Sequence, residues 1–176
     1  NRGCIPSKQL LYHADVLETV ERADEFGIDA TVEDVAFAEI VREVNEDVDA
    51  DAASIQRGLT ASDQHRLLDG EARFVDDRTV EVTGGPDDGV RIQAGTILIA
   101  AGTRPAVPPF HGLQTVEYLT SREALELESP PDHLVIVGGG YVAAELGQFF
   151  DTFGSDVTIV GRRPNLLPQA DEEVSA

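Results

Sequence analysis

Residues 133–147, HLVIVGGGYVAAELG, decide the fold of this chain of 176 residues. The apolar run from Leu134 to Val137 predicts a short buried strand, and the three glycines that follow predict a tight turn. A helix is predicted over 142–153, Gly154 ends it, and residues 157–160 form the next strand. The packed side of the helix is expected to carry Val142, Leu146, Phe149 and Phe153. This order predicts the first strand, helix and strand of a nucleotide-binding α/β domain.

The glycine turn matches the G-x-G-x-x-A pattern of dinucleotide-binding proteins. In that pattern Gly138 permits the tight turn, Gly140 lets a pyrophosphate approach the positive end of the helix, and Ala143 keeps helix and strand close. NAD-binding proteins usually carry an acid at the end of the next strand, where this chain has Arg162 and Arg163. Two guanidinium groups there favour the 2′-phosphate of NADPH over NADH.

The composition indicates an acidic protein. Its 33 acidic and 13 basic side chains leave a formal net charge of −20, which excludes a nucleic-acid-binding surface of the ordinary basic kind. No apolar run reaches the roughly 18 residues that a membrane span needs, and one cysteine makes no internal disulfide. Lys8 is the only lysine, and the other basic residues are arginines. We interpret this as the composition of a protein from a salt-accumulating cytoplasm, where salt screens the repulsion between surface carboxylates.

The first eight residues, NRGCIPSK, contain the single cysteine, Cys4. It precedes a helix predicted over 5–26, with Pro6 in the first turn and Gly27 at the end. Its place beside the positive end of this helix and beside Lys8 makes Cys4 a candidate nucleophile. Taken alone, a single cysteine is more often a buried and unreactive apolar residue.

Between these two segments the sequence predicts a second helix over 33–57 and a small sheet. The strands of this sheet are expected at 72–75, 79–82 and 90–92. The apolar run 96–101 predicts a further strand, buried on both faces. Consecutive prolines at 130 and 131 indicate a domain boundary, so we expect one domain over 1–128 and the start of another over 129–176.

Three segments together resemble the class I flavoprotein disulfide reductases. The redox segment of that family, C-x-N-x-G-C-[IV]-P-[ST]-K, is matched from Asn1 onward. Residues 96–105 are similar to the family's second FAD-contacting strand, and 138–147 look like its NAD(P) motif. The resemblance implies an α/β fold. A partial FAD-binding Rossmann-like domain with a β-hairpin or meander insertion would occupy 1–128, and the first βαβ of an inserted NAD(P)-binding Rossmann domain would occupy 129–176.

The resemblance also implies roles for individual residues. Cys4 would be the flavin-proximal cysteine that forms the thiolate–flavin charge-transfer pair, and a first cysteine two residues before Asn1 would attack the substrate. Lys8 would lie by flavin N5 and pair with Glu145, and Tyr141 would cover the flavin until the nicotinamide enters. The residues implied to contact FAD or the nucleotide are Gly3, Lys8, Ala101, Gly102, Thr103, Arg104, Gly138, Gly140, Ala143, Glu145, Arg162 and Arg163.

The implied activity passes electrons from NADPH through FAD to the Cys4 disulfide and on to a low-molecular-weight disulfide, such as one built on mycothiol or γ-glutamylcysteine. The segment after the cysteine helix looks most like mycothione reductase, whereas Ser7 matches the dihydrolipoamide and mercuric enzymes. Dihydrolipoamide dehydrogenase working with NAD, mercuric reductase, and a non-catalytic NAD(P)-binding redox-sensing module are the alternatives.

We expect the full-length protein to be a cytoplasmic homodimer that acts on a small molecule, with no nucleic-acid partner, no membrane partner and no metal site. The resemblance implies that the first FAD strand, the interchange cysteine and the dimer domain lie outside these 176 residues. We therefore expect the isolated chain to be inactive.

Overall fold

The computed structural model describes residues 2–175 and divides into two compact units. The first unit comprises the residues up to 51 together with those from 105 onward, and the second comprises 52–104. None of the described helices is long and apolar enough to cross a membrane. The domain boundary predicted after residue 128 falls inside the first unit and stays a prediction.

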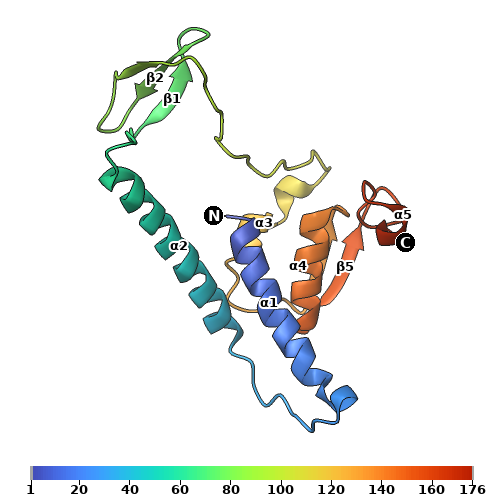
Figure 1. The fold of residues 1–176 in the computed structure, drawn as a ribbon. Helices are drawn as coiled ribbons and strands as arrows, with labels where there is room; N and C mark the ends of the chain where they lie inside the picture. The colour runs from blue at the N-terminus through green and yellow to red at the C-terminus, as the bar shows by residue number, and fades with distance from the viewer. Residues whose placement is uncertain (1, 176) are drawn as a thin grey trace. The chain divides into compact units, whose positions relative to one another are not determined.

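The first unit combines helices with a two-stranded parallel sheet. Its elements are α1 (Cys4–Glu21), the 3₁₀ helix η1 (Ala23–Phe26), the first half of α2 (Phe37–Ala61), η2 (Leu113–Thr115), α3 (Ser121–Ala124), β4 (His133–Val137), α4 (Tyr141–Thr152), β5 (Asp156–Val160) and α5 (Glu172–Ser175). β4 and β5 pair in parallel from His133 opposite Asp156 to Val137 opposite Val160. The predicted strand–helix–strand unit is therefore confirmed. α4 is its crossover helix, and α1 packs beside α4 (Figure 1).

Phenylalanine side chains form the centre of the core of this unit. Phe149 and Phe150 of α4 are at most 1% exposed. Phe37, at the start of α2, places its ring 5.6 Å from that of Phe149, and the Phe153 ring lies 4.9 Å from Phe149. The other core residues are Leu10, Ala14, Val41, Val44, Leu125 and Leu146. Because the core draws on α1, α2 and α4, apolar burial holds the cysteine helix against the nucleotide-motif helix.

Helix ends differ from the predicted positions by a few residues. The helix predicted over 5–26 is α1 followed by η1, and Gly27 caps η1 with φ 74° as its place in the sequence suggested.

Two burial expectations are wrong. Val142 is 55% exposed while its neighbour Ala143 is buried, because α4 turns Ala143 toward the rest of the unit. β4 is only half-buried on one face, and its other face, with Val135 62% exposed, is not covered by any described residue.

The second unit holds a small antiparallel sheet. β1 (Glu71–Phe74), β2 (Thr79–Thr83) and β3 (Arg91–Gln93) pair in the order β1-β2-β3, as predicted to within two residues. On the central strand, Glu81 is 8% exposed and accepts hydrogen bonds from Arg73 Nε at 2.8 Å and Arg91 Nε at 2.9 Å. One carboxylate therefore links all three strands.

The prediction of a buried strand over 96–101 is wrong for the described structure. The segment has no strand geometry, and Leu98 and Ile99 are 88% and 72% exposed. A strand needs a neighbour for its backbone hydrogen bonds, and no described residue of the second unit pairs with this segment. In the described structure this apolar run therefore has no strand partner and is exposed.

Candidate functional site

The cysteine lies at the beginning of α1. Cys4 is the first residue of the helix, its thiol is free and exposed, and Gly3 precedes it as the N-cap residue. Pro6 follows in the first turn, where its missing N–H costs the helix no hydrogen bond. The Gly3 carbonyl accepts the first helical bond, from Ser7 N at 3.0 Å. Asn1, where the matched redox segment begins, lies outside the described residues.

Lys8 and Glu145 meet across the contact between α1 and α4. Lys8 Nζ donates to Glu145 Oε1, which joins two residues 137 positions apart in the chain. The lysine side chain is 59% exposed and the glutamate 31% exposed. Exposed ion pairs stabilise folds only weakly. The ion pair that the resemblance implied is thus present, and because it is exposed it adds little to the stability of the fold.

Ser7 also contacts Glu145, which the sequence did not reveal. Its buried hydroxyl lies 3.0 Å from Glu145 Oε2, the oxygen that Lys8 leaves free, and 3.3 Å from the Cys4 carbonyl oxygen. The sequence carried no signal for this role, because the predicted helix began after Cys4. In the structure Cys4 is the first residue of α1, so Cys4 and Ser7 lie three residues apart on one helix face, and the packing of α1 on α4 brings Glu145 to that face.

The glycine turn connects β4 to α4. Gly138 has φ 124°, which side chains rarely adopt, and its N–H donates to the Val160 carbonyl at 2.9 Å. Gly140 is the N-cap of α4, and a Cβ atom built on it would meet nothing within 4 Å. The turn therefore leaves open space in front of the free N–H groups of a helix N-terminus. This arrangement fits the approach of a dinucleotide pyrophosphate.

Two small residues let α4 lie close to the sheet. Ala143 is 6% exposed. One turn later, a Cβ atom on Gly147 would lie 3.4 Å from Ile159 Cδ1 and 3.6 Å from Ile136 Cδ1. The inner side of α4 therefore touches the side chains of both strands, and a side chain longer than that of alanine at 147 would push the helix away from them.

Arg162 and Arg163 begin at the same edge of the sheet as the glycine turn. β5 ends at Val160, which is the register partner of Val137, the last residue of β4. Both arginines are exposed, and neither makes an ion pair with a described residue. Two cations are thus available beside the turn that would hold the pyrophosphate.

Tyr141 is the first residue of α4 and is 63% exposed, so its ring is free to contact a ligand. The remaining predicted FAD contacts belong to the second unit. Ala101, Gly102, Thr103 and Arg104 are all exposed there. Gly102 has φ 70°, the left-handed conformation that glycine adopts without strain.

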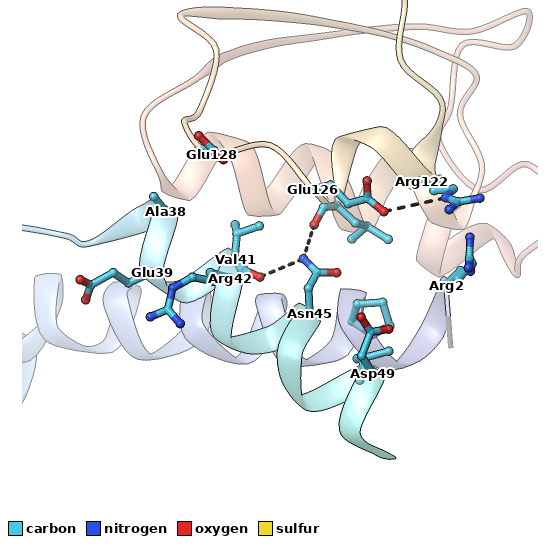
Figure 2. A pocket seen from close by; sticks show the side chains of 13 residues that line it. Arg2, Ala38, Glu39, Val41, Arg42, Asn45, Asp49, Arg122, Glu126 and Glu128 are labelled. Atoms are coloured by element: carbon cyan, nitrogen blue, oxygen red, sulfur yellow. Dashed lines mark hydrogen bonds and ion pairs between the residues drawn. The ribbon is translucent and has the colours of Figure 1, made fainter. Parts of the chain in front are cut away.

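An open cleft of about 660 Å³ in the first unit contains none of the predicted site residues. Figure 2 shows Asn45 within it, donating to the Val41 and Leu125 carbonyls at 2.9 and 3.0 Å. The cleft is lined by Arg2, Pro6, Ala38, Glu39, Val41, Arg42, Asn45, Val48, Asp49, Arg122, Leu125, Glu126 and Glu128. Three arginines face four carboxylates there, so its charge does not select a ligand of one sign.

Within the part of the chain that the structure describes, no cluster of His, Cys, Asp and Glu is arranged to hold a metal ion.

An exposed thiol and a dinucleotide turn lie on two helices that share one core and one ion pair. The helix that begins with Cys4 and the helix that follows the glycine turn therefore belong to one packed unit. Residues 1–176 match the pyridine nucleotide-disulphide oxidoreductase family, and the chain belongs to it. Flavoproteins of this family use FAD and NAD(P)H.

Named relatives agree with this assignment. A mercuric reductase from Bacillus cereus is 35% identical over 175 residues, covering 99% of this chain and 27% of the relative. A mycothione reductase from Mycobacterium tuberculosis is 34% identical over 178 residues, covering 99% of this chain and 38% of the relative. The solved structure of the HOCl-induced flavoprotein disulfide reductase RclA from Escherichia coli is similar with a TM-score of 0.77 at 28% identity, covering 99% of this chain and 35% of that one. The chain thus spans about a third of the length of these proteins.

Proposed function

We propose that the full-length protein is an NADPH-dependent reductase of a low-molecular-weight disulfide. One observation carries the proposal. The Lys8–Glu145 pair joins the helix that begins with Cys4 to the helix that begins with the nucleotide turn. The thiol and the nucleotide motif therefore belong to one packed unit, as electron transfer between them requires.

The residues of the turn would hold NADPH. Gly138 and Gly140 leave room for the pyrophosphate, and the α4 N-terminus supplies N–H donors and a positive dipole. Arg162 and Arg163 would take the 2′-phosphate, since guanidinium groups bind phosphate oxygens in a bidentate manner. The absence of an acid at the end of β5 argues against dihydrolipoamide dehydrogenase working with NAD.

Bound FAD would accept a hydride from NADPH and pass the electron pair on to the disulfide. Lys8 would place a cation beside the flavin, Glu145 would keep that cation in position, and Tyr141 would cover the ring. Gly3, the N-cap residue of α1, and residues 101–104 would contact the rest of FAD. The exposed Cys4 fits this arrangement because its thiol is free to approach a ligand at the helix N-terminus.

The thiol chemistry needs a second cysteine, which the resemblance implies two residues before Asn1. Its thiolate would attack one sulfur of the substrate, form a mixed disulfide and release the first product thiol. The Cys4 thiolate would attack the enzyme sulfur of that mixed disulfide, release the second product thiol and restore the enzyme disulfide. In balance, one disulfide, one NADPH and one proton give two thiols and NADP⁺. A homodimer and a cytoplasmic location stay predictions.

Mercuric reductase is the second candidate. Its support is the 35% identity to the Bacillus cereus protein and the presence of serine at position 7, which matches the mercuric and dihydrolipoamide enzymes. The mycothione reductase from Mycobacterium tuberculosis is nearly as similar at 34% identity. Overall identity therefore does not choose between an organic disulfide and Hg(II).

The test is a Cys4→Ser variant of the full-length protein, purified in high salt. We expect it to lose NADPH-dependent reduction of every disulfide in a panel of mycothione, bis-γ-glutamylcystine and lipoamide. Reduction of an artificial electron acceptor, which bypasses the thiols, is expected to continue. Reduction of Hg(II) but of no disulfide by the wild-type protein would select the second candidate. Full disulfide reduction by Cys4→Ser would show that Cys4 is not the redox thiol.

A further inference from the structure

The Ser7 hydroxyl lies between the redox cysteine and the ion pair. Ser7 is 7% exposed on the first turn of α1. Its Oγ atom is 3.0 Å from Glu145 Oε2 and 3.3 Å from the backbone carbonyl of Cys4. A serine hydroxyl has one proton to donate, so these two acceptors compete for it.

The carboxylate is the stronger of the two acceptors. A hydrogen bond to an ionised oxygen is shorter and stronger than one to a neutral carbonyl, and the observed distances follow that order. Ser7 therefore donates to Glu145 Oε2 while Lys8 donates to Oε1. Among the described residues, these are the two groups that hold the carboxylate, one on each oxygen.

A third group that fixes the Glu145 carboxylate would help to order this ion pair. Lys8 is a long side chain that is 59% exposed, and holding it in one geometry costs side-chain entropy. A buried hydroxyl on the same helix turn costs much less to hold in place. If Ser7 holds one carboxylate oxygen, the other is left pointing at Lys8.

We propose that Ser7 is a positioning residue, whose hydrogen bond to Glu145 holds the carboxylate so that it directs Lys8. The proposal rests on the proposed function for its consequence, because a directed Lys8 matters only if the lysine serves the flavin. The contact itself is testable whether or not that function is correct.

The experiment uses the full-length holoenzyme. Acetylation of Lys8 by acetic anhydride is followed in time by peptide mass spectrometry. Ser7→Ala is expected to speed this acetylation about ten-fold. This factor corresponds to the loss of a charge-assisted hydrogen bond whose strength is at the lower limit of the usual range. Glu145→Gln, which removes the charged partner, sets the upper limit. Ser155→Ala is the matched control, because Ser155 is 4% exposed and its hydroxyl has no partner among the described residues.

A second pair of variants separates the hydrogen bond from packing. Threonine keeps a hydroxyl at position 7, whereas valine has nearly the same shape without one. We expect Ser7→Thr to keep Lys8 protected and Ser7→Val to expose it as Ser7→Ala does. Equal acetylation rates in Ser7→Thr and Ser7→Val would overturn the proposal, as would a Ser7→Ala rate equal to that of the wild type.

The flavin spectrum distinguishes failure of the Ser7 proposal from failure of the proposed function. Two-electron reduction of the wild-type protein is expected to produce a long-wavelength charge-transfer band, and Ser7→Ala is expected to weaken it while Ser7→Thr preserves it. A wild type without the band would contradict the proposed function, and the acetylation rates would still decide the role of Ser7. A band that is unchanged in Ser7→Ala, together with unchanged acetylation, would overturn the role of Ser7 alone.

Discussion

Replacing Gly140 by valine tests whether the glycine turn binds the nucleotide, without greatly disturbing the fold. Gly140 has φ −92° and ψ −174°, an extended conformation that valine adopts readily, and a Cβ atom there would meet nothing within 4 Å. The cost to the fold is the poorer N-cap, about 1 kcal/mol. The new methyl groups would project into the open space in front of the α4 N-terminus.

The expected loss of NADPH affinity follows from the hydrogen bonds that the valine blocks. A hydrogen bond to a charged group contributes about 1.5–3 kcal/mol, and a pyrophosphate held away from the helix would lose at least one of them. Since 1.4 kcal/mol corresponds to a factor of ten, the Kd for NADPH should rise about 10- to 100-fold.

Isothermal titration of the full-length protein with NADPH measures this change directly. Gly58→Val is the matched control, because Gly58 lies in α2, a Cβ atom there would also meet nothing within 4 Å, and it is not part of the turn. The control should bind NADPH as the wild type does. Wild-type affinity in a folded Gly140→Val protein would refute the assignment of this turn to the nucleotide.

Three further predictions test the core, the coenzyme preference and the small sheet. Phe149→Ala should lower the free energy of unfolding by about 3–5 kcal/mol, seen as a lower Tm, because Phe149 is 1% exposed and packs on three other rings. Replacing Arg162 and Arg163 together by alanine should weaken NADPH binding about ten-fold or more and leave NADH binding unchanged; equal losses for both coenzymes would contradict the 2′-phosphate role. Hydrogen bonds from Arg73 and then Arg91 hold the pKa of Glu81 below its ordinary value of 4.5. The stabilisation of the fold by the Glu81 carboxylate is therefore complete above the ordinary pKa, and it is lost as the pH falls through the lowered pKa of the folded state. Thermal unfolding should show Glu81→Gln less stable than wild type at neutral pH, with the difference shrinking in acid; a pH-independent difference would contradict this cause.

Local patterns predicted the parts of the fold that depend on neighbours in the sequence. The apolar run before the glycines, the turn itself and the helix after it are confirmed in β4, Gly138 and α4, because the turn and helix depend on local contacts and the strand that pairs with β4 follows directly after α4. The pairing of Lys8 with Glu145 came from family resemblance alone. No periodicity connects two residues 137 positions apart.

Long-range packing explains what the sequence left out. The hydrogen bond from Ser7 to Glu145 exists because α1 packs on α4, and a sequence pattern does not say which helices meet. Residues 96–101 have the composition of a buried strand, but burial needs a neighbouring strand, and the described residues provide none. Val142 follows the period of the packed helix face, yet at the first turn of α4 it stays more than half exposed.

The central claim is that Cys4 is a redox thiol coupled to a flavin that NADPH reduces. Anaerobic titration of the full-length protein with NADPH, and separately with NADH, while the flavin spectrum is recorded, tests it most directly. We predict a long-wavelength charge-transfer band after two electrons per flavin, formed faster with NADPH than with NADH. Bleaching of the flavin without that band would contradict the claim, and a protein that carries no flavin would leave only a nucleotide-binding module.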